Sequence, residues 1–186
     1  MEKEHLEPVK LLEKLCELST VLNEESIDSA KKFKVSLEII RSILKFDVSI
    51  LYRVQNIVGN LLLLEVVDID DPNNLRPDLY KEITIKINLN RPQHEFANEA
   101  AAFNSKGISN INVPGEGSDL IGYIYAPEDE GGGYLFGGDY LGDIANINKS
   151  ERHTFEVMCN LLSGVFNREI NKKMATYDSL TGLYNS

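Results

Sequence analysis

The fold of this chain is decided by residues 48–67, which read VSILYRVQNIVGNLLLLEVV. Apolar side chains recur at every second position over residues 48–54, as they do in a strand with one buried face. A polar turn around Gly59 follows, and residues 61–67 are then almost all apolar, as in a central strand that is covered on both faces. The stretch therefore predicts a β-hairpin within a sheet that has both faces covered.

Four further strands are predicted after this hairpin, because short apolar or alternating runs are separated there by Gly, Pro and Asn. They are residues 82–87, 108–113, 120–126 and 134–136. Asn90 and Gln93 have the spacing of a helical capping box, with Pro92 in the first turn. We therefore predict a short helix that begins there and ends at Gly107.

Helices are predicted at both ends of the chain, from apolar residues that recur every three or four positions. The N-terminal helix carries four of them, namely Leu11, Leu15, Leu18 and Leu22. Residues 33–44 repeat the spacing and predict a second helix. Asn148 and Glu151 form another capping box, and no Pro follows it as far as Thr176. The last helix is therefore about 28 residues and about 42 Å long. The predicted fold class is α+β, an antiparallel sheet of about six strands with helices on both faces and long N- and C-terminal helices.

The composition is that of an ordinary globular protein, with 42% apolar and 26% charged residues and a net charge of -10. An acidic chain without clustered Lys and Arg is not expected to bind nucleic acid, because binding to phosphates needs such clusters. The sequence shows neither a leader pattern nor a membrane-spanning apolar run, so we expect a cytoplasmic location without membrane contact. Cys16 and Cys159 are expected to be reduced thiols, and the three His lack the spacing of metal ligands.

The last residues carry the most specific motif in the sequence. Residues 178–185 read DSLTGLYN, which resembles the D-x-L-T-G-L-x-N signature that opens the GGDEF domain of diguanylate cyclases. The agreeing positions are Asp178, Leu180, Thr181, Gly182, Leu183 and Asn185. The resemblance implies that a cyclase domain, which would bind Mg²⁺ and GTP and make cyclic di-GMP, follows beyond Ser186.

A second stretch is similar to the catalytic loop of the same family, but only in its first part. Gly137, Gly138 and Asp139 match the start of that loop, whereas Tyr140 and Leu141 stand where the family has Glu and Phe. The stretch also precedes the opening motif instead of following it. We therefore predict a tight turn at these residues and no catalytic role.

Residues 26–170 resemble GAF domains in the order and size of their predicted elements. GAF domains are small-molecule sensor modules that often precede cyclase domains, and the long flanking helices favour them over the shorter PAS domains. The resemblance implies four parts of the chain. They are an N-terminal helix over residues 1–25, a GAF-like domain over 26–148, a signalling helix over 149–177 and the start of a GGDEF domain over 178–186.

In the GAF arrangement a ligand pocket would lie between the sheet and residues 90–133. The expected walls are aromatic, namely Phe96, Phe103, Tyr123, Tyr125 and Tyr134, and the expected polar contacts are His94, Asn98 and Asp119. Plain core packing is the alternative for the aromatic residues. The signatures of cyclic-nucleotide-binding and bilin-binding relatives are missing, so the ligand is an unidentified small molecule, and we expect no other cofactor and no metal in this chain.

The resemblances together imply the sensory part of a bacterial diguanylate cyclase, which is not itself catalytic. The leucine stripe of the N-terminal helix either covers the chain's own core or pairs with the last helix across a two-fold axis, and we favour a homodimer of the second kind. The alternatives are a ligand-free dimerisation scaffold with the same fold and a free-standing redox enzyme that uses its cysteines.

Overall fold

A computed structural model describes residues 8–113, 117–126, 132–141 and 147–176 of the chain. Its helices are α1 (Pro8–Asn23), α2 (Ser29–Leu44), the short 3₁₀ helix η1 (His94–Phe96), α3 (Ala97–Ser105) and α4 (Lys149–Thr176). Its strands are β1 (Val48–Val58), β2 (Leu61–Asp70), β3 (Thr84–Asn88), β4 (Ile108–Ser109), β5 (Asn112–Val113), β6 (Gly117–Ile124) and β7 (Tyr134–Tyr140). The strands form one antiparallel sheet in the order β3-β2-β1-β7-β6-β4, and β5 also pairs with β6. This architecture confirms the predicted α+β fold class.

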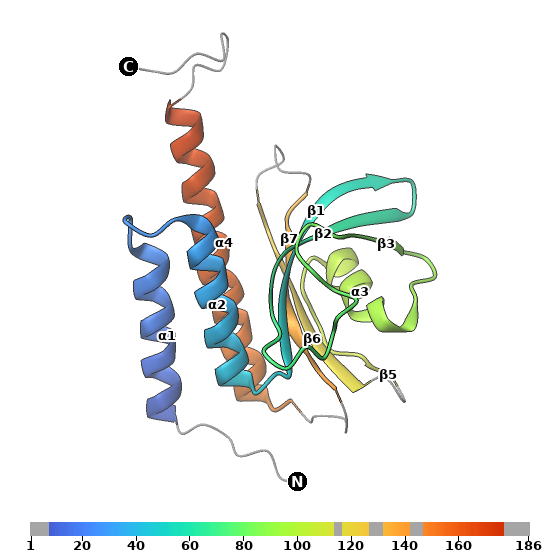
Figure 1. Cartoon of the computed structure of the whole chain (residues 1–186), viewed down its shortest axis with the longest axis horizontal. Coiled ribbons are helices and arrows are strands. Elements are labelled where there is room, and N and C mark those ends of the chain that lie inside the picture. Colours follow the sequence, from blue (N-terminus) through green and yellow to red (C-terminus); the bar gives the residue numbers. More distant parts are fainter. Residues whose placement is uncertain (1–7, 114–116, 127–131, 142–146, 177–186) are drawn as a thin grey trace.

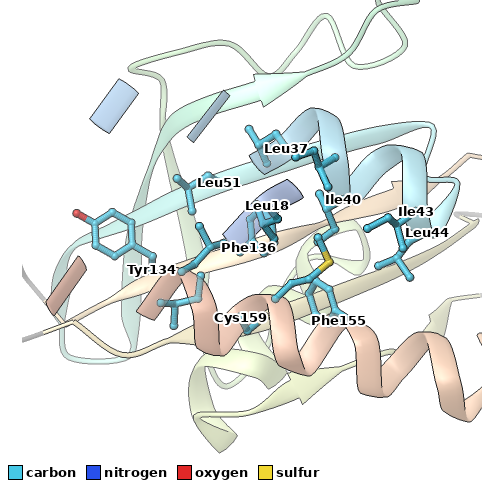
Figure 2. Packing of buried hydrophobic residues seen from close by; sticks show 14 of the residues in the cluster. Leu18, Leu37, Ile40, Ile43, Leu44, Leu51, Tyr134, Phe136, Phe155 and Cys159 are labelled. Carbon is cyan, nitrogen blue, oxygen red and sulfur yellow. The ribbon is translucent and has the colours of Figure 1, made fainter. Parts of the chain in front are cut away.

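The sheet is the middle of three layers. Helices α1, α2 and α4 cover one face and α3 covers the other (Figure 1). Because side chains alternate along a strand, neighbouring residues of one strand belong to different cores. Leu51 and Phe136 contribute to the core under α2 and α4, where Figure 2 shows them beside Leu37, whereas Tyr52 and Leu135 contribute to the core under α3.

The predicted hairpin and the predicted last helix are both confirmed. β1 pairs with β2 in a register that closes with Val58 opposite Leu61. At the start of α4 the Asn148 amide donates to Glu151 Oε2 at 3.0 Å, and the Glu151 amide donates to Asn148 Oδ1 at 2.8 Å. This reciprocal pair satisfies two backbone donors that the helix itself leaves free.

The helix predicted from Asn90 begins later than the capping spacing indicated. The side chain of Asn88 accepts from the amides of Asn90 at 3.0 Å and Arg91 at 3.2 Å, so a turn precedes the helix. Regular α-helix starts only with α3, after the 3₁₀ turn of η1. At its other end the helix stops at Ser105, short of Gly107, the end that we had expected, because Lys106 takes the left-handed conformation with φ of 51°.

The prediction of a tight turn at Gly137, Gly138 and Asp139 is wrong, because all three lie within β7. A Cβ atom on Gly137 would lie 2.0 Å from the carbonyl oxygen of Leu120 on β6. A Cβ atom on Gly138 would lie 2.4 Å from the carbonyl oxygen of Val48 on β1. The glycines are therefore needed for the close approach of β7 to both neighbouring strands, and not for a turn.

The leucine stripe of α1 belongs to the chain's own core. Leu18 and Leu22 are fully buried beside residues of α2 and α4, and the other two leucines of the stripe pack against the same core. We had favoured pairing of this stripe across a two-fold axis. The structure uses the stripe within the chain's own core instead. A different face of α1 is open, since Val9 is 66% and Leu12 is 62% exposed.

Candidate functional site

A group of buried and half-buried polar side chains lies between α3 and the sheet. Tyr52 on β1, Asp119 on β6 and Asp139 on β7 share the sheet face that α3 covers, and Asp119 stands directly opposite Asp139 in the strand register. Glu99 of α3 is only 2% exposed and lies over this face. Together with Arg76, which bonds to Asp139, we call these five residues the Glu99 cluster.

Glu99 has an unused hydrogen-bonding atom in this core. The Tyr52 hydroxyl donates to Glu99 Oε1 over a long 3.5 Å, and Oε2 has no hydrogen-bond partner among the described residues. Burial, followed by the negative charges of Asp119 and Asp139, raises the pKa of Glu99 well above its ordinary value. A buried polar atom without a partner costs about 1–3 kcal/mol, and such atoms are rare in folded proteins.

Arg76 is shared between two carboxylates at the edge of the cluster. Its Nη1 donates to Asp139 Oδ2 at 2.7 Å, while Nε and Nη2 donate to the two oxygens of Asp78 at 3.1 and 3.0 Å. Burial raises the pKa of Asp139, and the guanidinium opposes this shift. Burial also raises the pKa of Tyr52, as does the Glu99 carboxyl. Because Arg76 serves both partners, it does not neutralise the cluster as a whole.

Asn98, a predicted polar contact, fastens the segment that follows α3. Its Nδ2 donates to the Ile111 carbonyl at 2.9 Å, and its Oδ1 accepts from the Ser109 hydroxyl at 2.8 Å and from the Ile111 amide at 2.5 Å. The Asn98 amide is thus engaged by backbone and hydroxyl groups. It holds β4 and its continuation against α3, next to Asp119, whose Oδ2 lies 3.5 Å from Nδ2.

Aromatic side chains line the same core beside the cluster. Phe96 and Phe103 are buried there, and the half-buried Tyr123 meets Phe103 edge-on at 6.1 Å between ring centres. Lys106 Nζ lies 3.4 Å from the ring centre of Phe103 and 4.4 Å from that of Tyr123. The Tyr123 hydroxyl donates to the Gly132 carbonyl at 2.6 Å. Phe103 and Tyr123 therefore form the apolar end of the site, and the Lys106 ammonium already lies against both rings.

The structure brings five of the eight predicted contacts to this side of the sheet and places the other three elsewhere. His94 is exposed on η1, and Tyr125 is 57% exposed after β6. Tyr134 lies on the opposite face of the sheet, where its ring stacks on Phe166 of α4 at 3.9 Å between ring centres. The parity of β7 decides this, because Leu135 occupies the α3 face instead.

The sequence reasoning missed four members of the cluster. Glu99 was overlooked although it stands three residues after Phe96 and four before Phe103, on the apolar stripe of its helix. A carboxylate on such a stripe is the signal that could have found it. Tyr52 was hidden in the apolar alternation of β1, and Arg76 and Asp139 carry no local signal because their pairing spans 63 residues.

The remaining features considered in the sequence, namely metal ligands, cysteines, membrane spans and the cyclase-like motif, do not belong to this cluster. Among the described residues no group of three or more His, Cys, Asp or Glu is arranged to hold a metal ion. Cys16 is exposed on α1, whereas Cys159 of α4 is buried, and this burial raises the pKa of its thiol. Within the same described ranges, none of the helices is long and apolar enough to span a membrane. The cyclase-like motif of residues 178–185 lies outside the described residues.

No protein-family model and no curated protein matches the sequence. Solved structures do match the fold. The GAF domain of an Acinetobacter phosphoenolpyruvate-protein phosphotransferase is 15% identical with a TM-score of 0.58, over 94% of this chain and 99% of that one. The phycocyanobilin-bound GAF domain of a cyanobacterial phytochrome is 12% identical with a TM-score of 0.62, over 88% and 97%. Part of a methyl-accepting chemotaxis protein is 13% identical with a TM-score of 0.57, over 85% and 99%. At such low identity the likeness concerns the fold alone, and the chain therefore has the GAF fold.

Proposed function

We propose that this chain is the sensory module of a bacterial diguanylate cyclase, in which a small ligand bound at the Glu99 cluster controls the synthesis of cyclic di-GMP. The observation that carries the proposal is Glu99 itself, a buried carboxyl with Oε2 lacking a partner among the described residues. A ligand that makes a hydrogen bond with Oε2 would remove the cost of leaving that atom without a partner. Apolar walls with a few convergent polar groups are the usual make-up of a small-molecule site.

β7 offers a direct route from the ligand to the last helix. On one side of this strand Leu135 and Asp139 face α3, and on the other Tyr134 and Phe136 face α4. The ring of Tyr134 stacks on Phe166, and that of Phe136 stacks on Phe155 with ring centres 6.1 Å apart. A ligand that shifts β7 therefore changes the packing of α4, and one that binds two packings unequally shifts their populations.

The end of α4 connects this route to the cyclase-like motif. The helix continues to Thr176, past the start of α2 in Figure 1, and Asp178 of the motif follows two residues later. The six matching positions of that motif support a cyclase domain beyond Ser186, where GTP and Mg²⁺ would bind. In this arrangement α4 carries the state of the sensor to the catalytic part.

The gene expressed to its natural stop codon tests this function. The product is incubated with GTP and Mg²⁺, and cyclic di-GMP is measured by chromatography, for the wild type and for Glu99→Gln. We expect product from the wild type and an altered turnover number in the variant, which keeps the shape of the side chain but cannot ionise. The absence of a cyclase domain after Ser186, or equal turnover of both proteins with and without a cell extract of small molecules, would contradict the proposal.

We also propose that the chain forms a homodimer, because a cyclase of this type needs two GTP-loaded domains face to face. The exposed Val9 and Leu12 support this, and Cys16 continues the same face of α1 at a spacing of three and four residues. Sedimentation should show a dimer that Leu12→Glu weakens and that Glu13→Lys, a control on an exposed neighbour, leaves intact. A monomer at all concentrations would contradict the homodimer, and a dimer that never holds a ligand would support the scaffold function instead.

A further inference from the structure

We propose that the ligand of the Glu99 cluster is an amidinium-type cation, a planar group with several N–H donors attached to an apolar body. The inference rests on the proposed function and names the chemical class of its ligand. It starts from Oε2 of Glu99, a buried oxygen that has no hydrogen-bond partner among the described residues. A cation would take the place of the proton that burial keeps on Glu99, and this proton would pass to solvent. A charged N–H donor to the resulting carboxylate makes a shorter and stronger bond than a neutral donor does.

The electrostatics of the cluster favour a cation over a neutral or anionic ligand. At Glu99 the negative charges of Asp119 and Asp139 each outweigh the positive charge of Arg76. Arg76 is held between Asp139 and Asp78, so its guanidinium is already committed. A ligand carboxylate or phosphate placed here would be repelled in a medium of low dielectric constant, whereas a cation would be attracted.

The geometry around Glu99 favours a planar donor over a compact ammonium. Tyr52 Oη lies 3.5 Å from Glu99 Oε1, so two oxygen acceptors from different elements stand side by side. A planar fork can donate to both at once, whereas an ammonium is a point charge without this directional match. The fork would also replace the long bond between the two side chains with two short ones.

The apolar part of the ligand is defined by the aromatic residues. Phe96, the last residue of η1, and Phe103 of α3 stand three residues before and four residues after Glu99, and both are buried in the same core. The faces of Phe103 and Tyr123 already hold the Lys106 ammonium, so a second cation is disfavoured at that end. The cationic end of the ligand therefore belongs at Glu99 and its apolar body beside Phe96.

Three probes of nearly identical shape test the charge requirement. Benzamidine is cationic, benzamide is neutral and benzoate is anionic, and binding of each to the full chain is followed by calorimetry and by amide NMR shifts. We expect benzamidine to bind at least tenfold more tightly than benzamide, with shifts in α3, β6 and β7, and benzoate not to bind. Glu99→Gln should abolish the preference for benzamidine, whereas Glu95→Gln, which removes an exposed charge from η1, should preserve it.

The outcomes separate this inference from the proposed function. Equal or tighter binding of benzamide or benzoate, or a preference that survives Glu99→Gln in a variant with native circular dichroism, overturns the cationic ligand. If a neutral or anionic molecule from cells binds, and this binding requires Glu99, the cationic ligand is refuted but the sensory function is supported. If no probe and no molecule from cells binds in a way that requires Glu99, both the cationic ligand and the sensory function are refuted.

Discussion

The substitution Glu99→Gln is expected to change how the free energy of unfolding depends on pH. Gln has nearly the shape of a protonated Glu but cannot ionise. The folded chain raises the pKa of Glu99 through burial, Asp119 and Asp139, so it keeps a proton that the unfolded chain releases near its ordinary pKa of about 4.3. Only below that pH should the free energies of unfolding of the wild type and the variant change with pH in the same way.

The sign and size of the effect follow from proton linkage. Above the unfolded pKa the folded wild type binds one proton more than the unfolded chain, so its stability is lost as the pH rises towards the folded pKa. Relative to Glu99→Gln, the free energy of unfolding of the wild type should fall by up to about 1.4 kcal/mol per pH unit between the unfolded and the folded pKa of Glu99. The fall should stop once the pH exceeds the raised pKa of Glu99 in the folded chain.

Urea unfolding followed by circular dichroism measures this difference at half-unit steps from pH 4 to pH 8. Glu95→Gln is the control, because Glu95 is exposed beside the same helix and should track the wild type. A difference curve between wild type and Glu99→Gln that stays flat would refute the reasoning, since Glu99 would then have the same pKa in both states. A curve that rises with pH would show that the folded chain lowers the pKa of Glu99. Burial would then not be the dominant influence on this carboxyl.

Three further predictions concern packing and reactivity. Gly137→Ala should lower the free energy of unfolding by about 1–3 kcal/mol in urea, because its Cβ would lie 2.0 Å from the Leu120 carbonyl oxygen. Tyr140→Phe should cost about 1–3 kcal/mol in the same assay, because the buried hydroxyl donates at 2.5 Å to the last carbonyl of α2. Ellman's reagent at neutral pH should modify Cys16 rapidly in the native chain and Cys159 only after denaturation, since burial raises the pKa of the second thiol and hides it.

Sequence alone was sufficient for the elements whose signals are local. The period-two pattern of residues 48–54 and the turn at Gly59 lie within β1 and its hairpin, and the Asn148–Glu151 capping box marks the start of α4. Gly137 and Gly138 were misjudged for the opposite reason. Paired glycines suggest a turn locally, but here they are required by the backbones of β1 and β6, which are distant in sequence.

The candidate site was predicted only in part, because its assembly depends on strand parity and on long-range pairing. Phe96 and Phe103 follow from the stripe of α3, which is a local pattern. Tyr134, an expected pocket wall, packs in the core on the other face, because a shift of one residue in β7 exchanges the two faces of the sheet. Glu99 was missed because a single polar residue does not disturb an apolar stripe, yet in the structure it is the residue on which the site depends.

Native mass spectrometry of the chain, purified gently from cells, tests the central claim most directly. We predict that part of the wild-type protein retains a small molecule of one defined mass and that Glu99→Gln loses it while Glu95→Gln keeps it. Bare wild-type protein in every preparation, together with no added metabolite binding in a Glu99-dependent way, would contradict a ligand site on the α3 face. The GAF fold would then serve this chain as a scaffold rather than as a sensor.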